Sequence, residues 1–312
     1  MNPLPPQEAT EFGVAASKAF AAIGGMDAAR RAEEDPTFRS TQVADTLNAL
    51  GLEDLDPRAD ADALAAAAAF CESAGRAALP YPIASALLAD DQGRPFAVVP
   101  DGTPRVDHGD LFPEWTVSTA NGSMALARPA RERLKTVLGP FVTDLELGEA
   151  VSDPAPVDHH LALTACAVLG AVDRALELAV QHVNGRIQFG KPISSFQAVQ
   201  FQLADCAVAV AGLRELTHFT LWRVGEDVRT ARPDVLALRL HSIDVARQVL
   251  RTSQQLHGAA GVCDEYDVSV LTRMVQPALR LPWSAERTAA ALADAIHEHG
   301  FEGLFPHGGV PA

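Results

Sequence analysis

The feature that most constrains the fold is the spacing of apolar residues from position 158 onward, where they recur every three or four positions. This period places apolar side chains along one face of an α-helix. Pro192 and Pro233 interrupt the pattern, a glycine-rich turn follows Leu256, and a last helix is expected at 284–299. Long helices with short breaks predict an antiparallel four-helix bundle over residues 152–312. The second of these helices has a coiled-coil-like seam made of Phe196, Val199, Leu203, Cys206, Val210 and Leu213.

The chain before this region has two other patterns. Alanine-rich amphipathic segments at 7–23, 41–50 and 61–78 predict an N-terminal helical domain over residues 1–90. Short runs bounded by Gly, Pro, Asp and Asn follow, and they predict the strands of a small middle β domain over residues 91–151: PFAVVP, WTVSTA, SMALA and TDLELGEAV. The expected fold class is therefore mainly α with a small β unit.

Composition argues against several classes of function. The formal net charge of −15 disfavours binding to the phosphate backbone of nucleic acids. None of the four cysteines forms a CxxC pair, so no zinc or redox motif is expected, and at least three are predicted as small core residues. The first residues lack a signal-peptide pattern and no apolar run reaches the length of a membrane span, which favours the cytoplasm. Neither GxSxG nor a P-loop is present to support a hydrolase or an NTPase.

Two segments carry the residues expected to bind a ligand. In RIQFGKPI, Arg186 can hold an anionic group through two hydrogen bonds, Gln188 offers an amide, and Phe189 offers a flat apolar face. In QLHGAAG, which begins at Gln255, the glycines let backbone N–H groups approach a phosphate. The alternative is that Arg186 and Gln255 are ordinary residues at helix ends.

Taken together, the two segments resemble the acyl-CoA dehydrogenase family. The pattern RxQFGxPIxxFQxxQxxLAD is similar to the family's, and so is the glycine turn, which is followed here by Glu265, Tyr266, Val268 and Arg273. The match covers roughly residues 155–300 well and the N-terminal helices more loosely. The resemblance implies N-terminal helices, a middle β-barrel and a C-terminal helix bundle.

The resemblance also implies a reaction and a cofactor. The family carries out α,β-dehydrogenation of an acyl-CoA thioester: a carboxylate removes the α-proton and FAD accepts the β-hydride. Electron-transfer flavoprotein is the implied electron acceptor. Residues of the two segments would bind the pyrophosphate and adenine end of the neighbouring subunit's FAD: Arg186, Gln188, Phe189, Gln255, Gly258 and Ala259. Ala259 replaces the family's second glycine, and its methyl group would narrow the approach.

The chain departs from the family in its middle region and at the base. The family's flavin-cradling strand motif and its later Trp-containing motif have only faint echoes between residues 91 and 150. At the two positions where family members carry the base, this chain has Pro282 and His160. His160 is a weak candidate base or a helix cap. Glu286 is a weak catalytic candidate as a shifted base, or a solvated carboxylate at a helix N-terminus.

These departures resemble the short subunit of bacterial acyl-CoA dehydrogenases built as heterotetramers of two long and two short chains, known from sterol side-chain degradation. The chain would then lend residues to a longer partner's FAD and be inactive alone. The serious alternative is a homo-oligomeric acyl-CoA dehydrogenase that uses Glu286, and a third is a non-enzymatic helical scaffold. A ferritin-like di-iron bundle would need two Glu-x-x-His motifs, and only the one ending at His218 is present.

Overall fold

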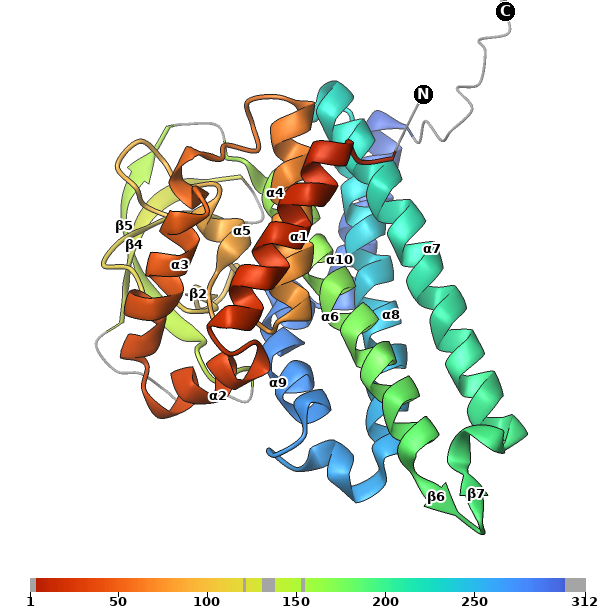
Figure 1. The fold of residues 1–312 in the computed structure, drawn as a ribbon. Coiled ribbons are helices and arrows are strands. Elements are labelled where there is room, and N and C mark those ends of the chain that lie inside the picture. Colours follow the sequence, from red (N-terminus) through yellow and green to blue (C-terminus); the bar gives the residue numbers. More distant parts are fainter. Residues whose placement is uncertain (1–3, 120–121, 131–137, 153–154, 301–312) are drawn as a thin grey trace, which may run out of the picture.

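The computed structural model describes residues 4–119, 122–130, 138–152 and 155–300. Short N-terminal helices pack against one side of a bundle of long helices, and a small sheet lies beside both (Figure 1). The prediction of a mainly α chain with a small β unit is confirmed. The division at residues 90 and 151 into separate domains stays a prediction.

The N-terminal helices are short and joined by tight turns. They comprise α1 (Gln7–Ala22), α2 (Met26–Glu34), a π-helical turn (Arg39–Val43), α3 (Ala44–Ala49), a 3-10 turn (Leu52–Asp54), α4 (Ala61–Arg76) and α5 (Ile83–Ala86). Neither α2 nor α5 was expected from the sequence, because α2 is only nine residues long and α5 four. Such short helices form mainly through packing, which single-sequence periodicity does not report.

The sheet has five strands in the order β1-β3-β4-β5-β2. They are β1 (Phe96–Val98), β2 (Arg105–Val106), β3 (Trp115–Ser118), β4 (Met124–Pro129) and β5 (Thr143–Val151). Only the β1–β3 pair is parallel; the other three pairs are antiparallel. Each predicted run forms a strand, whereas the two-residue β2 was not predicted. The buried side chains of β1, β3 and β4 form a small core around Trp115.

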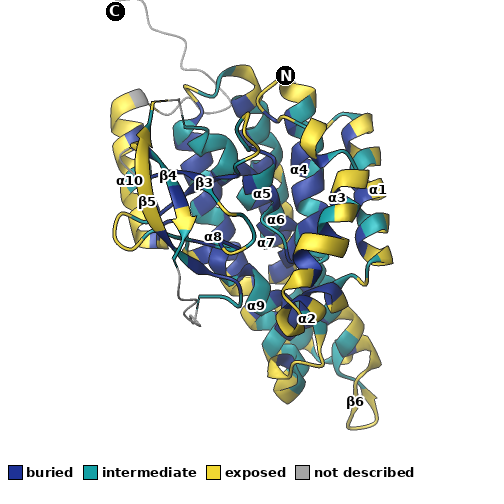
Figure 2. Cartoon of the chain, turned by 90° about the vertical axis from the view of Figure 1, so that its left-hand side faces the viewer, coloured by how far each residue is buried: buried dark blue, intermediate teal, exposed yellow. Residues whose placement is uncertain are grey.

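The bundle region holds α6 (Val157–Gly185), α7 (Gln197–Asp227), α8 (Arg232–His257), α9 (Asp267–Arg280) and α10 (Ala285–His299). Four helices were predicted there, and α9, which follows the glycine-rich turn, is the additional one. A hairpin of β6 (Ile187–Gln188) and β7 (Lys191–Pro192) and a 3-10 turn (Ile193–Ser195) join α6 to α7, and a 3-10 turn (Gly258–Val262) follows α8. The bundle interior is buried, whereas the hairpin is exposed (Figure 2). Along the predicted seam of α7, Cys206, Val210 and Leu213 are buried. The N-terminal part of the seam, with Phe196, Val199 and Leu203, is only partly buried.

The crossing of α4 and α6 is unusually close. A Cβ atom on Gly75 would overlap the carbonyl oxygen of Ala167, and one on Gly170 would overlap that of Glu72. Glycine at both positions therefore lets the two backbones touch. Ion pairs surround the contact: Arg76 binds Asp173 and Glu177, and Arg214 of α7 binds Glu72 at 2.6 Å. This crossing fixes the N-terminal helices to the bundle.

Candidate functional site

Both predicted binding segments lie at one end of the bundle. Helices α6 and α8 end side by side there, as the contact between them shows: the imidazole rings of His182 and His257 stack with centroids 4.2 Å apart. Arg186 directly follows α6 and Gln255 lies in the last turn of α8. The two segments are therefore brought together in space, as the resemblance implied. We call this end of the bundle, with the β6–β7 hairpin and the turn at Gly258–Val262, the bundle tip.

The hairpin holds Phe189 in an exposed and strained position. Gln188 pairs with Lys191, so Phe189 and Gly190 are the two turn residues, with φ of 52° and 79°. Two-residue hairpins favour such positive φ values, which Gly and Asn adopt easily and a phenylalanine does not. The Phe189 side chain is 91% exposed, and its ring meets Phe196 edge-on at 6.3 Å. Strain and exposure in one aromatic residue are typical of a binding surface.

The polar side chains of the bundle tip are available to a ligand. Arg186, Gln188 and Gln255 are exposed, and their side chains make no hydrogen bond or ion pair with any residue that the structure describes. Helices α6 and α8 both end here, and the negative C-terminal ends of their dipoles disfavour a bound anion. A free guanidinium and two amides offset that field and match the oxygen-rich diphosphate of FAD. The donor set therefore fits the cofactor that the resemblance implies.

The glycine turn leaves room for a ligand on one side and packs tightly on the other. Gly258 has φ of 63°, and a Cβ placed there would meet nothing within 4 Å. Ala259 next to it is exposed, so its methyl group does not fill a buried space. Gly261 is the opposite case: a Cβ there would overlap the backbone of Gln254, whose side chain donates to the Gly261 carbonyl at 3.2 Å.

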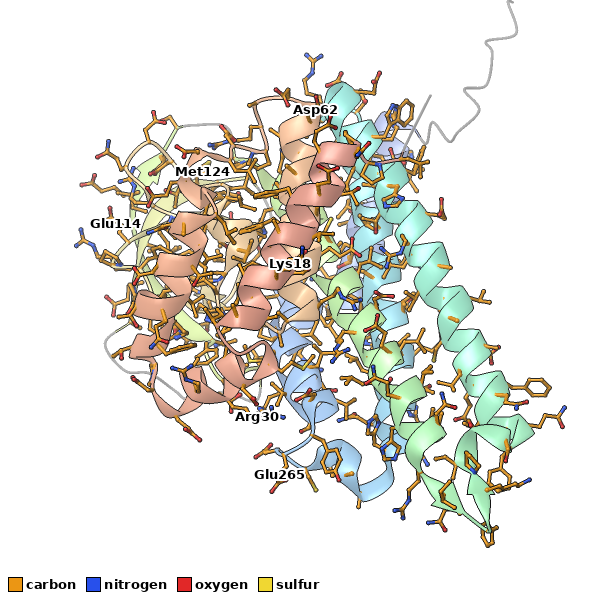
Figure 3. All side chains as sticks on the ribbon, viewed as in Figure 1. Lys18, Arg30, Asp62, Glu114, Met124 and Glu265 are labelled. Atoms are coloured by element: carbon orange, nitrogen blue, oxygen red, sulfur yellow. The ribbon has the colours of Figure 1, made fainter. Side chains whose placement is uncertain are left out.

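The loop that follows the turn is anchored to α2. Arg30 donates to the carbonyl of Asp264 at 3.1 Å and pairs with Asp267 at 3.0 Å. Arg273 pairs with Glu33 at 2.9 Å and with Asp264. Figure 3 shows Arg30 and Glu265 near each other at this end of the molecule. Arg273, which the family resemblance singled out, thus holds the turn in place.

A cavity of about 170 Å³ lies between α4, α5, α6, α9 and the strands β1 and β2. Its walls are mostly apolar, and both family base positions, Pro282 and His160, line it. Burial and the nearby Arg239 lower the pKa of His160 to about 4. His160 is therefore neutral at neutral pH, with Nε2 3.2 Å from the Ser85 hydroxyl and Nδ1 buried without a partner in the described residues.

The cavity also contains a carboxyl group that sequence reasoning missed. Asp107 follows β2 and lines the cavity, and burial raises its pKa to about 7. Its neighbour His108 stacks on Phe141 at 4.8 Å and contacts Arg39, which is bound by Asp110. No local motif marked Asp107, because it follows a two-residue strand and is buried by helices that are distant in the chain, whereas the nearby Arg39 acts to lower its pKa.

Glu286 does not line this cavity. It lies exposed in the first turn of α10, where hydrogen bonds from its own backbone N–H and from Ser284 lower its pKa. Ser284 caps the same helix by accepting from the N–H of Arg287. This is the environment of a solvated carboxylate at a helix N-terminus.

Other sequence-based expectations have simpler outcomes. Cys71, Cys166 and Cys206 are buried as predicted, whereas Cys263 is exposed. Among the described residues, no cluster of His, Cys, Asp and Glu has the form of a metal site, so the pair Glu215 and His218 has no iron-binding partners there. No helix in the described parts of the chain is long and apolar enough to cross a bilayer.

Parts of this chain are similar to a known family and to known proteins. Residues 156–279 match the family model of the acyl-CoA dehydrogenase C-terminal domain. The acyl-CoA dehydrogenase IpdE2 of Mycolicibacterium smegmatis is 28% identical over 163 residues, which are 52% of this chain and 48% of that protein. FadE28 of Mycobacterium tuberculosis is 29% identical over 48% of each chain. The chain spans about half the length of the curated relatives it matches.

Solved structures share the fold over nearly the whole chain. A variant of the steroid ACAD Tcur3481–Tcur3483 superimposes with a TM-score of 0.80 at 20% identity, over 94% of this chain and 98% of that one. The ChsE4–ChsE5 complex of Mycobacterium tuberculosis gives 0.77 at 18% identity, over 96% and 99%. At such identities the similarity establishes the fold.

Proposed function

We propose, from the match of residues 156–279 to the acyl-CoA dehydrogenase C-terminal domain, that this chain is a subunit of an FAD-dependent acyl-CoA dehydrogenase. Its bundle tip contributes residues to an FAD site shared with a longer partner chain, and the partner supplies the catalytic base. The substrate is an acyl-CoA thioester whose Cα–Cβ bond is oxidised. FAD supplies the acceptor for the hydride when it is bound.

The observation that carries the proposal is the contrast between the bundle tip and the chain's own cavity. At the bundle tip, Arg186, Gln188 and Gln255 are exposed, and their side chains make no hydrogen bond or ion pair with the described residues. In the chain's own cavity, the family's base positions hold a proline and a neutral imidazole, Pro282 and His160. A chain that keeps the cofactor-binding surface but not the base is suited to completing another subunit's site.

Each residue of the bundle tip would have a definite task. Arg186 would hold the diphosphate through its planar guanidinium. Gln188 and Gln255 would add amide hydrogen bonds, and Gly258 with Ala259 would let the backbone approach the cofactor. Phe189, already presented at the hairpin turn, would cover a flat ring or an apolar surface of the partner.

We further propose a bulky polycyclic acyl group, such as a steroid side-chain thioester, as the substrate. Support comes from the steroid ACAD named among the structures with the same fold. Electron-transfer flavoprotein is the proposed electron acceptor, and the proposed assembly is a heterotetramer.

One observation favours a second candidate, in which this chain is catalytic itself. Asp107 is a carboxyl group in an apolar cavity with a pKa of about 7, and such groups act as general bases. Asp107→Asn and Glu286→Gln separate the candidates. Under our proposal both variants of the complex keep turnover within a few-fold of wild type. Loss of a general base typically costs roughly 10²–10⁴-fold, and a fall of that size with flavin content unchanged would identify a base in this chain.

The proposal itself is tested by the stoichiometry of flavin. Co-expression with the longer partner chain should give a yellow complex with one FAD per pair of different chains. The chain purified alone should contain little flavin. A homo-oligomer of this chain with one FAD per subunit would contradict the shared site and favour the homo-oligomeric enzyme.

A further inference from the structure

Two titratable rings at the bundle tip have no role in the assignment above. His182 and His257 stack with an angle of 28° between their planes, and the Tyr266 ring meets His257 edge-on at 6.5 Å. His182 lies one helical turn before Arg186, and His257 directly precedes Gly258. His182 therefore lies just before one of the two segments proposed to hold the FAD diphosphate, and His257 belongs to the other.

The fold fixes which nitrogen of His257 is free. Its Nδ1 lies 2.7 Å from the carbonyl oxygen of Ser253. A carbonyl oxygen only accepts hydrogen bonds, so Nδ1 must carry the proton. In the neutral ring, Nε2 then presents a lone pair, which repels a phosphate oxygen. A second proton on Nε2 turns the same atom into a charge-assisted donor.

The pair holds at most one extra proton. Two imidazolium rings 4.2 Å apart would repel each other, so the second protonation is strongly disfavoured. Burial, His257 and Arg186 lower the pKa of His182. The helix C-termini act in the opposite direction and favour a cation. Without an anion, the lowered pKa of His182 favours its neutral form at neutral pH.

We propose that the His182–His257 pair takes up one proton when the diphosphate of FAD binds at the bundle tip. This rests on the proposed function. Two negative charges arriving beside the pair favour its protonated form, and the proton adds a donor to those of Arg186. The groups that face the pair are Arg186 at the end of α6 and Tyr266 in the loop before α9. In that loop Asp264 is paired with Arg273, and Glu265 is exposed.

Linkage gives the sign of the pH dependence. If binding raises the pKa of the pair, protons are taken up between the free and bound pKa values. The affinity for FAD is then highest at low pH and falls as pH rises through the bound pKa. The slope reaches at most about tenfold per pH unit for one proton. If the histidines serve only to balance the helix dipoles, binding leaves their protonation unchanged.

Calorimetry of the flavin-free complex tests this directly. FAD is titrated near pH 7 in two buffers of different ionisation enthalpy, and the difference in heat gives the protons exchanged. We expect about 0.3–1 proton taken up per FAD. His182→Phe, which keeps an aromatic ring, and His257→Gln, which keeps a polar group, should each remove most of the uptake and flatten the pH dependence. The control His241→Gln, on α8 away from its end, should leave both unchanged.

The outcomes separate this inference from the proposed function. FAD binding by the wild-type complex without proton uptake overturns the inference and leaves the shared site standing. Uptake that persists in both histidine variants also overturns it, because another group would then carry the proton. Failure of the wild-type complex to bind FAD overturns the proposed function. The wild-type measurement requires no variant, so a misfolded variant cannot hide the answer.

Discussion

The guanidinium of Arg186 is the single group on which the proposed shared cofactor site would depend most. It is exposed at the end of α6 and has no acidic partner among the described residues, although the chain carries 40 acidic residues. A long cation left unpaired in so acidic a protein is expected where an anionic ligand supplies the missing charge.

Arg186→Ala should lower the flavin content of the purified complex without unfolding the bundle. A guanidinium paired with a diphosphate contributes about 1.5–3 kcal/mol, which corresponds to a roughly ten- to hundredfold loss in affinity. Arg186→Lys should recover only part of it, because an ammonium keeps the charge but not the planar fork. The measurement is bound FAD by absorbance, with helicity followed by circular dichroism. If the Arg186→Ala complex keeps its full flavin content at low added FAD, Arg186 does not bind the cofactor and is only a residue at a helix end.

Asp107 has a consequence for stability that is independent of catalysis. Its folded pKa of about 7 lies above the unfolded value of about 3.9, so its charged form is disfavoured in the folded chain. The stability it contributes is fully present below about pH 4 and is lost as pH rises through about 7. Its side chain is 29% exposed, and solvent reduces the effect.

We therefore expect the free energy of unfolding of Asp107→Asn, relative to that of wild type, to increase by about 1–2 kcal/mol as pH rises from 5 to 8. Urea unfolding at the two pH values measures the difference. Asp110→Asn is a poor control because Asp110 binds Arg39; Asp91→Asn, on an exposed turn before β1, is a better one. An equal effect of Asp107→Asn at both pH values would mean that the carboxyl is already charged in the folded protein.

At the scale of the elements, the long helices and the cofactor-binding segments follow from the sequence, and the cavity does not. The spacing from Leu161 to Leu256 predicted α6, α7 and α8, because an amphipathic period is a local property. Arg186 and Gln255 lie at the same end of the bundle, and their role in binding FAD stays a prediction from the family resemblance. Asp107 and the α4–α6 contact could not be predicted, because helices distant in the chain bury Asp107 and because Gly75 meets Ala167, which lies far along the chain.

The α4–α6 contact gives a test at this scale. Gly170→Ala should destabilise the chain by about 3 kcal/mol or more, because the new methyl group overlaps the backbone of α4 and neither helix can yield easily. Gly212→Ala in α7, where a Cβ meets nothing within 4 Å, is the matched control and should stabilise by about 0.5–1 kcal/mol. Thermal unfolding compares the two. Equal effects would show that the close crossing is not a fixed feature in solution.

At the scale of the whole molecule, the exposed apolar side chains gather toward the bundle tip and the adjoining part of α7. Phe189, Phe201, Val208 and Val262 are 91%, 60%, 73% and 71% exposed. Side chains of this size are rarely left in water on a chain that functions alone. The distribution favours a partner that covers this end, as the proposed shared flavin site would require.

Phe189→Asp should therefore weaken assembly with the longer chain while leaving the helicity of this chain intact. A carboxylate at the turn would be buried without a partner, which costs several kcal/mol. Aspartate also adopts positive φ more readily than phenylalanine, so the hairpin itself should not suffer. Sedimentation of the mixed chains measures the association. Val14→Asp, on the exposed face of α1, controls for the added charge, and equal assembly of both variants would exclude the hairpin from the interface.

The strained, outward-facing hairpin also bears on how a cell would keep the two subunits in balance. An aromatic side chain held in water on a short turn is the kind of surface that chaperones and proteases sample on incompletely assembled proteins. The aromatic side chain would be exposed on a copy of this chain without its partner and buried on a copy within the proposed complex. If the proposed two-chain complex forms, surplus subunits would then be cleared while assembled ones persist, and the exposed hairpin would help to keep the two chains in equal amounts.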